Sequence, residues 1–96
     1  MPLSEALRRR DAVLRAFLGP DGRLLSIPSR HAKRLVVLDH LAQRFEPGRR
    51  YDEVEVNREL RSVHEDVAAL RRYLVDEGFL SRESGTYWRT GGTVPV

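Results

Sequence analysis

His64 and Asp66 have side chains of the types that bind metal ions or act as an acid–base pair, and they stand two residues apart. One histidine and one aspartate are too few ligands for zinc. The other histidines, His31 and His40, lie on segments with no ligand spacing. We therefore predict a local role, in which His64 and Asp66 accept hydrogen bonds from backbone N–H groups where a helix begins, and Asp66 also binds an arginine.

Other kinds of reactive site are missing from the sequence. No nucleophile stands near a base in a known pattern, and no glycine-rich loop could hold a phosphate. The chain has no cysteine, which excludes a disulfide framework and a cysteine-based metal site and fits a reducing cytoplasm. We predict no enzymatic activity, no metal and no cofactor, and a cytoplasmic location.

Membrane association is not expected either. No apolar run approaches the length that would cross a bilayer. The first ten residues, MPLSEALRRR, place charges where a secretion signal would need its apolar region, so we expect no targeting segment.

The arginines are the better candidates for a binding site, because a guanidinium can bind phosphate or guanine through two hydrogen bonds. Two of them lie on a helix predicted over residues 65–77, and two flank the turn that follows it. Two further cations near the start of an earlier helix could contact the DNA backbone. The candidate nucleic-acid-binding residues are Arg71, Arg72, Arg82, Arg89, Lys33 and Arg34.

The two arginines of that helix differ in what their neighbours predict. Arg71 lies next to Leu70 and one turn before Leu74, so we expect its stem to pack and its guanidinium to pair with an acid. Arg72 should be exposed. Asn57, on the preceding helix, is predicted to form a turn or interhelix hydrogen bond.

Acidic residues oppose a DNA-binding role for the second half of the chain. The net charge is +3, but residues 1–50 hold eleven basic against five acidic side chains, and residues 51–96 hold six against nine. Glu65 and Asp66 lie at the leading end of the predicted recognition helix, where they would repel phosphate. Nucleic-acid binding remains compatible with these acids in two ways. Either the acids pair with Arg49, Arg50, Arg71 or Arg72, or the basic first half of the chain is the nucleic-acid face.

The elements that would position these residues are clearest over residues 64–89. This stretch reads as an amphipathic helix, a stop at Gly78, a short strand, a turn at residues 84–85 and an aromatic strand. A helix followed by a small hairpin is the closing half of a winged helix-turn-helix. The helix is then the candidate recognition element, and residues 83–86 are the tip of the wing.

The helix before it has two agreeing start signals. Asp52 and Glu55 have the spacing of a capping box, in which each side chain reaches the backbone N–H of the other. Tyr51 and Val56 occupy the positions of a hydrophobic staple. Residues 49–51 should be extended and should join the later hairpin as a first strand.

Three elements are predicted in the first half of the chain. A helix capped by Ser4 carries an apolar stripe up to residue 18. Residues 23–27 read as a short strand with Leu25 and Ile27 on one face. A second helix, over residues 30–45, should begin at a Ser29 cap.

These elements predict an α+β fold, with a winged helix-turn-helix core, an extra N-terminal helix and a short strand. Residues 1–90 should form one domain, and residues 91–96, which carry no pattern, should form a flexible tail.

Several segments resemble a bacterial family known as domain of unknown function 2087. The family pattern has an isoleucine–proline start, a segment similar to YDEVEVN, a histidine and an aspartate two residues apart, an LRR triplet and a closing YWR. The resemblance covers about residues 12–90. The corresponding positions are Ile27 and Pro28, residues 51–57, His64 and Asp66, residues 70–72, and residues 87–89.

Two positions depart from that pattern: Asp52, where the family tends to have threonine, and Ser29, where a basic residue is usual. The resemblance implies a helix-turn-helix-like domain, which is sometimes appended to a DNA-binding module in transcriptional regulators. Here we expect the domain to stand alone.

The function that these observations favour is that of a DNA-binding or transcription-regulatory winged-helix domain with double-stranded DNA as its partner. One alternative is a protein-interaction or homodimerisation module on the same fold, which would have an exposed apolar face on the N-terminal helix. A second alternative is RNA binding through the basic first half.

Overall fold

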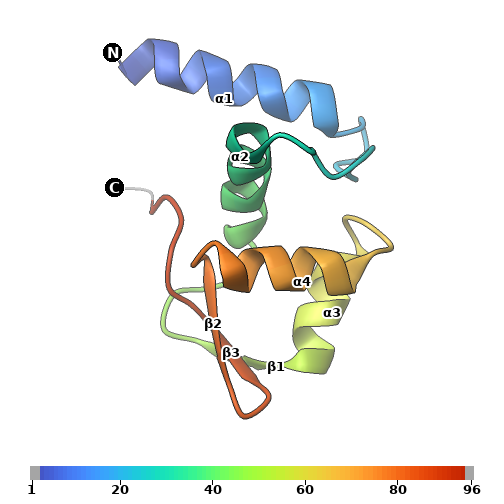
Figure 1. The fold of residues 1–96 in the computed structure, drawn as a ribbon, viewed down its shortest axis with the longest axis vertical. Helices are drawn as coiled ribbons and strands as arrows, with labels where there is room; N and C mark the ends of the chain where they lie inside the picture. The colour runs from blue at the N-terminus through green and yellow to red at the C-terminus, as the bar shows by residue number, and fades with distance from the viewer. Residues whose placement is uncertain (1–2, 95–96) are drawn as a thin grey trace.

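The structure is a computed structural model that describes residues 3–94. Apart from the predicted strand over residues 23–27, its helices and strands follow the predicted order, and they form an α+β fold (Figure 1). The helix α1 lies across one end of the molecule, and the hairpin turn lies at the other end of the longest axis (Figure 1). The elements are α1 (Leu3–Phe17), α2 (His31–Ala42), β1 (Arg50–Asp52), α3 (Glu53–Arg61), α4 (Val67–Asp76), β2 (Leu80–Glu83) and β3 (Thr86–Arg89).

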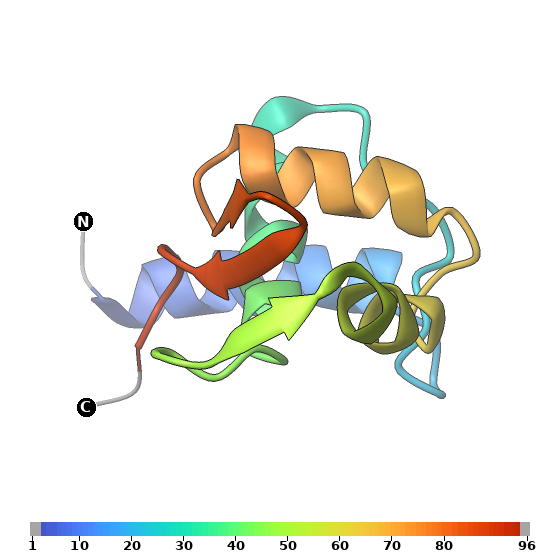
Figure 2. The ribbon, with the colours of Figure 1, turned by 90° about the horizontal axis from the view of Figure 1, so that it is seen from below.

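The three strands form one antiparallel sheet in the order β1–β3–β2. Tyr51 of β1 is paired with Tyr87 of β3, as the expected joining of residues 49–51 to the hairpin requires. Two residues, Ser84 and Gly85, connect β2 to β3 with φ angles of 51° and 79°. Two consecutive positive φ angles match the right-handed twist of the flanking strands, as in a type I′ turn. Figure 2 shows the sheet beside α3 and α4.

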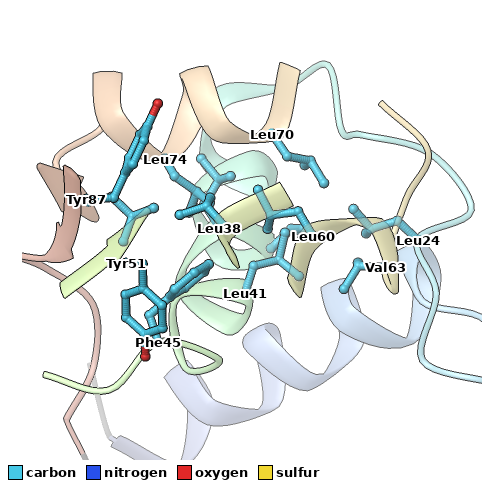
Figure 3. Packing of buried hydrophobic residues seen from close by; sticks show 13 residues of the cluster. Leu24, Leu38, Leu41, Phe45, Tyr51, Leu60, Val63, Leu70, Leu74 and Tyr87 are labelled. Atoms are coloured by element: carbon cyan, nitrogen blue, oxygen red, sulfur yellow. The ribbon is translucent and has the colours of Figure 1, made fainter. Parts of the chain in front are cut away.

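A single apolar core joins the sheet to α2, α3 and α4 (Figure 3). The aromatic rings of Phe45 and Tyr51 meet edge to face, with centroids 5.1 Å apart, a favourable aromatic geometry. The buried apolar side chains are Leu24, Val37, Leu38, Leu41, Ala42, Phe45, Tyr51, Val56, Leu60, Val63, Leu70, Leu74, Leu80 and Tyr87.

The start of α3 is built as its sequence predicts. The Asp52 carboxylate accepts a hydrogen bond from the Glu55 backbone N–H at 2.8 Å, and the Glu55 carboxylate accepts one from the Asp52 N–H at 3.2 Å. Tyr51 and Val56, the predicted staple pair, are both buried. These contacts satisfy backbone donors that the first helical turn leaves without partners.

Both predicted serine caps of the first half are wrong. Helix α1 already includes Leu3, so Ser4 lies inside it. Helix α2 begins after Arg30, whose backbone is extended and whose side chain makes no cap hydrogen bond. Ser29 is one residue too early to cap, and its carbonyl instead accepts from the Arg34 guanidinium at 3.0 Å. Helix α2 also ends at Ala42, before the predicted residue 45.

The predicted strand over residues 23–27 is reduced to one isolated bridge between Leu18 and Leu24. Leu25 and Ile27, predicted to share one face, have different surroundings, because Leu25 is 68% exposed and Ile27 packs against the core, while Leu24 is only 7% exposed. The Leu24 N–H donates to the Val63 carbonyl at 2.8 Å. A long-range backbone contact to the turn between α3 and α4 therefore sets which leucine enters the core.

The beginning of the predicted tail lies against α2. The backbone N–H of Thr93 donates to the Asp39 carboxylate at 2.6 Å, and the Thr93 hydroxyl donates to the same carboxylate at 3.0 Å. Gln43 donates to the Thr93 carbonyl at 2.7 Å. A loose tail predicts none of these contacts. Residues 95–96 of the tail lie outside the described residues, and the domain boundary at residue 90 stays a prediction.

Candidate nucleic-acid interface

Three of the six candidate residues meet in a cavity between α4 and the hairpin. Arg71 and Arg72 come from α4, and Arg82 comes from β2. Helix α4 presents these arginines because Leu70 and Leu74 occupy its buried side. The cavity has a volume of ≈ 280 Å³ and is lined by Ala68, Arg71, Arg72, Val75, Asp76, Arg82 and Tyr87.

The Arg71 guanidinium is held by neighbouring elements. Its Nε lies 3.7 Å from Oε1 of Glu53, and its Nη1 donates to the Asn57 side-chain oxygen. The predicted pairing of Arg71 with an acid and the predicted interhelix hydrogen bond of Asn57 are both confirmed. Because Glu53 neutralises it, Arg71 contributes less free positive charge to the cavity than its sequence position implies.

Tyr87 completes this network from the sheet side. Its hydroxyl donates to the same Glu53 Oε1 at 2.9 Å. Burial of the ring raises the pKa of the Tyr87 phenol above 10.0, and the Glu53 carboxylate raises it further. The hydroxyl therefore stays protonated at neutral pH and keeps its role as a donor. No local spacing links Glu53 to Tyr87, so sequence reasoning missed this contact.

Arg72 and Arg82 are the accessible cations of the cavity. Both are exposed, as predicted for Arg72. Among the described residues Arg72 makes no ion pair, and the Arg82 guanidinium lies 5.7 Å from the centre of the Tyr87 ring. A cation over an aromatic ring keeps its charge. Both side chains can therefore accept an anionic partner.

The other three candidates do not join this cavity. Arg34 donates to the backbone carbonyls of residues 28 and 29, and its guanidinium stacks on Tyr73 at 4.6 Å. Arg89 donates to the carbonyls of Phe45, Gly91 and Thr93. Lys33 is exposed and lies in a different hollow, between α1 and α2.

Most of the nearby carboxylates are occupied by internal partners. Glu55 pairs with Arg49 at 3.2 Å and Glu59 with Arg44 at 3.9 Å. Arg49 and Arg71 therefore pair with acids of α3, as one of the two alternatives allowed, but Glu65 and Asp66 at the leading end of α4 form no ion pair among the described residues. Arg44 was not expected as a partner, because it belongs to α2. Arg50 instead stacks on Trp88, with its guanidinium carbon 4.6 Å from the ring centre.

His64 and Asp66 have the predicted capping role. His64 Nδ1 accepts from the Asp66 N–H at 3.0 Å, and the Asp66 carboxylate accepts from the Ala69 N–H at 3.1 Å. The predicted bond from an arginine to Asp66 is not found in the part of the chain that the structure describes. Within residues 3–94, no three histidine or acidic side chains gather to hold a metal ion.

A family profile, described as an uncharacterized protein conserved in bacteria (DUF2087), matches residues 23–89. The chain belongs to this family. The match contains the cavity and the Arg71 network, whereas α1 precedes it. Comparison with curated proteins and with solved structures finds no match. Across residues 3–94, no helix is both long and apolar enough to span a bilayer.

Proposed function

We propose that this member of the DUF2087 family is a regulatory domain that binds double-stranded DNA in the manner of a winged helix. Helix α4 would enter the major groove, and the β2–β3 hairpin would contact the backbone. The proposal rests on one observation: Arg72 and Arg82, from the helix and the hairpin, lie exposed around one cavity. Guanidinium groups so placed can bind phosphates on either side of a groove.

The acidic leading end of α4 affects how such a complex would form. The Asp66 carboxylate is engaged with the Ala69 N–H, but Glu65 is exposed and has no ion pair among the described residues. Phosphates would be repelled there and attracted to Arg72, which lies further along the helix. We therefore propose shallow insertion through the middle of α4 and the hairpin. Chromosomal DNA as partner is consistent with the predicted cytoplasmic location.

A gel-shift experiment with random-sequence duplex at two salt concentrations tests this proposal. The double substitution Arg72→Glu and Arg82→Glu should abolish binding, because two phosphate contacts are lost and two acids are introduced. Wild-type affinity should fall with salt at a logarithmic slope of about −2, the value for about two neutralised phosphates.

The matched control is Arg8→Glu with Arg15→Glu on α1, which changes the net charge equally at the other end of the molecule (Figure 1). This variant should bind duplex nearly as well as wild type. Unchanged affinity in the Arg72 and Arg82 variant would refute the proposed face. Loss of binding only in the α1 variant, with a preference for RNA, would move the nucleic-acid face to the basic first half.

A further inference from the structure

A second surface lies at the end of the molecule opposite the hairpin turn, where α1 crosses the start of α2 (Figure 1). Two adjoining hollows of ≈ 340 Å³ and ≈ 300 Å³ share Arg9, Val13 and Lys33. We call them together the α1–α2 groove. Its lining residues are Ala6, Arg9, Arg10, Ala12, Val13, Ala16, Phe17, Ala32, Lys33 and Val36.

The floor of the α1–α2 groove is apolar and made mostly of small side chains. Its four alanines are exposed, and Val13 and Val36 are only partly buried. On the same helix, Leu7 is 47% exposed. Small residues allow a second helix to approach closely, since the distance between helix axes depends on the side chains at the contact. An apolar strip of this kind is typical of a protein-binding surface.

The rim of the groove is positively charged. All the charged side chains that line it are basic, namely Arg9, Arg10 and Lys33. Lys33 has no ion pair within residues 3–94, and Arg9 has only an exposed pair with Glu5 at 3.6 Å. Arg10 forms a long ion pair with Asp39, at 3.9 Å, and its Nε is buried with no hydrogen-bond acceptor among the described residues.

We propose that the α1–α2 groove binds an acidic amphipathic helix of a partner protein. The apolar face of that helix would lie on the alanines and valines, and its flanking carboxylates would meet the basic rim. Apolar anchors at i, i+3, i+4 and i+7 are the usual way in which a helix fills such a groove. Charge complementarity selects acidic partners by attracting them and repelling basic ones.

The two other possible occupants fit less well. A second copy would bring its own α1 to the groove, and that helix carries three consecutive arginines, Arg8 to Arg10, so like charges would face each other. A nucleic acid could pair its phosphates with the cations of the rim, but its bases would contact mainly methyl groups. The only aromatic ring among the lining residues is that of Phe17. Stacking platforms for bases need several aromatic side chains.

This binding role is distinct from the proposed DNA function, because no residue lines both the α1–α2 groove and the Arg72–Arg82 cavity. One wall of the groove, α1, also precedes the segment that the family profile matches. The proposed partner site is therefore a property that this chain gains from its N-terminal helix.

A fluorescein-labelled peptide of about 18 residues tests the proposal by fluorescence anisotropy, a length that allows an isolated helix to form. Leucine and alanine would occupy one face of the peptide, and glutamate would occupy the flanks. The wild-type protein should bind it. Arg9→Glu with Lys33→Glu should weaken binding about tenfold or more, because two attractive contacts become repulsive.

Arg8→Glu with Arg15→Glu is again the matched control, since neither residue lines the groove. That variant should bind the peptide within about twofold of wild type. Ala12→Glu provides a second test, because it places a bulky anion on the apolar floor at an exposed position and should abolish binding without disturbing the core.

Four results would overturn the proposal. A scrambled peptide of the same composition could bind as tightly, which would leave only generic charge attraction. The Arg9 and Lys33 variant could keep wild-type affinity. Sedimentation could instead show a dimer that Ala12→Glu dissociates, or RNA could bind the groove and be lost with Lys33→Glu, and either result would assign the groove to another occupant.

Discussion

Arg71 and Arg72 are adjacent on α4, yet they differ in exposure and in ion pairing. The Arg71 side chain is 21% exposed and is held by Glu53 and Asn57, both on α3. It joins α3 to α4 and shapes one wall of the cavity. Arg72 is exposed and has no such partner among the described residues, so no neighbouring acid neutralises its charge. At the scale of residues, tertiary pairing decides which cations can bind a partner.

Asp76 is the one acidic residue among those that line the cavity. A carboxylate there repels phosphate and offsets part of the charge of Arg72 and Arg82. We expect Asp76→Asn to tighten duplex binding about two- to fivefold at low salt, with a smaller gain at high salt, because exposed charges are screened. Gel-shift titration at two salt concentrations measures the gain. Unchanged or weaker binding at low salt would contradict DNA contact at this cavity.

His40 gives the fold a pH dependence of its own. Burial lowers its pKa below 6.5, and the positive charges of Arg10 and Arg44 lower it further, although Asp39 opposes them. The unfolded chain therefore binds a proton at His40 more readily than the folded protein. The contribution of neutral His40 to the free energy of unfolding is complete above pH 6.5. It is lost as the pH falls below 6.5 and through the lower pKa of the folded protein.

We expect the urea midpoint of the wild type to fall between about pH 7.5 and about pH 5.5, and the fall to be smaller in His40→Gln. Glutamine cannot gain a proton in this range, so the His40 contribution disappears. Equal slopes in the two proteins would show that His40 does not control this part of the stability curve.

Among the elements, α3 depends on its cap. Asp52→Ala removes the acceptor for the Glu55 N–H and should lower the free energy of unfolding by about 1 kcal/mol. Asp52→Asn is the matched control, because asparagine also caps helices well and should change stability little. Urea denaturation of both variants measures the difference. Equal losses in the two variants would attribute the effect to the charge of Asp52 instead of its hydrogen bond.

The hairpin turn depends on Gly85, whose φ angle of 79° is unfavourable for a residue with a Cβ. A Cβ at this position would meet no atom within 4 Å, so backbone strain is the only expected effect. Gly85→Ala should lower stability by about 1 kcal/mol, measured by thermal denaturation. Ser84→Asn should be neutral or stabilising, since asparagine is favoured in this type of turn. A stable Gly85→Ala variant would contradict the assigned turn.

At the scale of the whole molecule, the two proposed binding surfaces lie in different parts of the fold. The longest dimension is 40 Å, with α1 at one end and the hairpin turn at the other (Figure 1). Helix α2 connects the groove to the core.

We expect the two surfaces to act independently. Arg72→Glu with Arg82→Glu should leave peptide affinity unchanged, and Arg9→Glu with Lys33→Glu should leave duplex affinity within about twofold of wild type, because screening is strong over such distances. Measuring each ligand against each variant completes the test. A tenfold cross-effect would show that α2 couples the two ends.

The sequence by itself determined the elements that local patterns encode. The capping box at Asp52, the glycine stop at Gly78 and the turn at residues 84–85 involve neighbours in the chain, and the predicted helices and hairpin are confirmed there. The motifs of residues 51–57 and 70–72 likewise identified the family. Where local chemistry agrees with the fold, a single sequence is enough.

Only the tertiary structure decided how distant residues pair. Leu24 donates a backbone hydrogen bond to Val63 where the sequence predicted a strand. Arg89 donates to three backbone carbonyls and therefore does not join the candidate site. The Glu53–Tyr87 bond spans the chain from α3 to β3, and no periodicity encodes it. Ion pairs and buried backbone bonds form between whichever groups packing brings within reach. For this reason the sequence proposed six basic residues, and the structure brought three of them together.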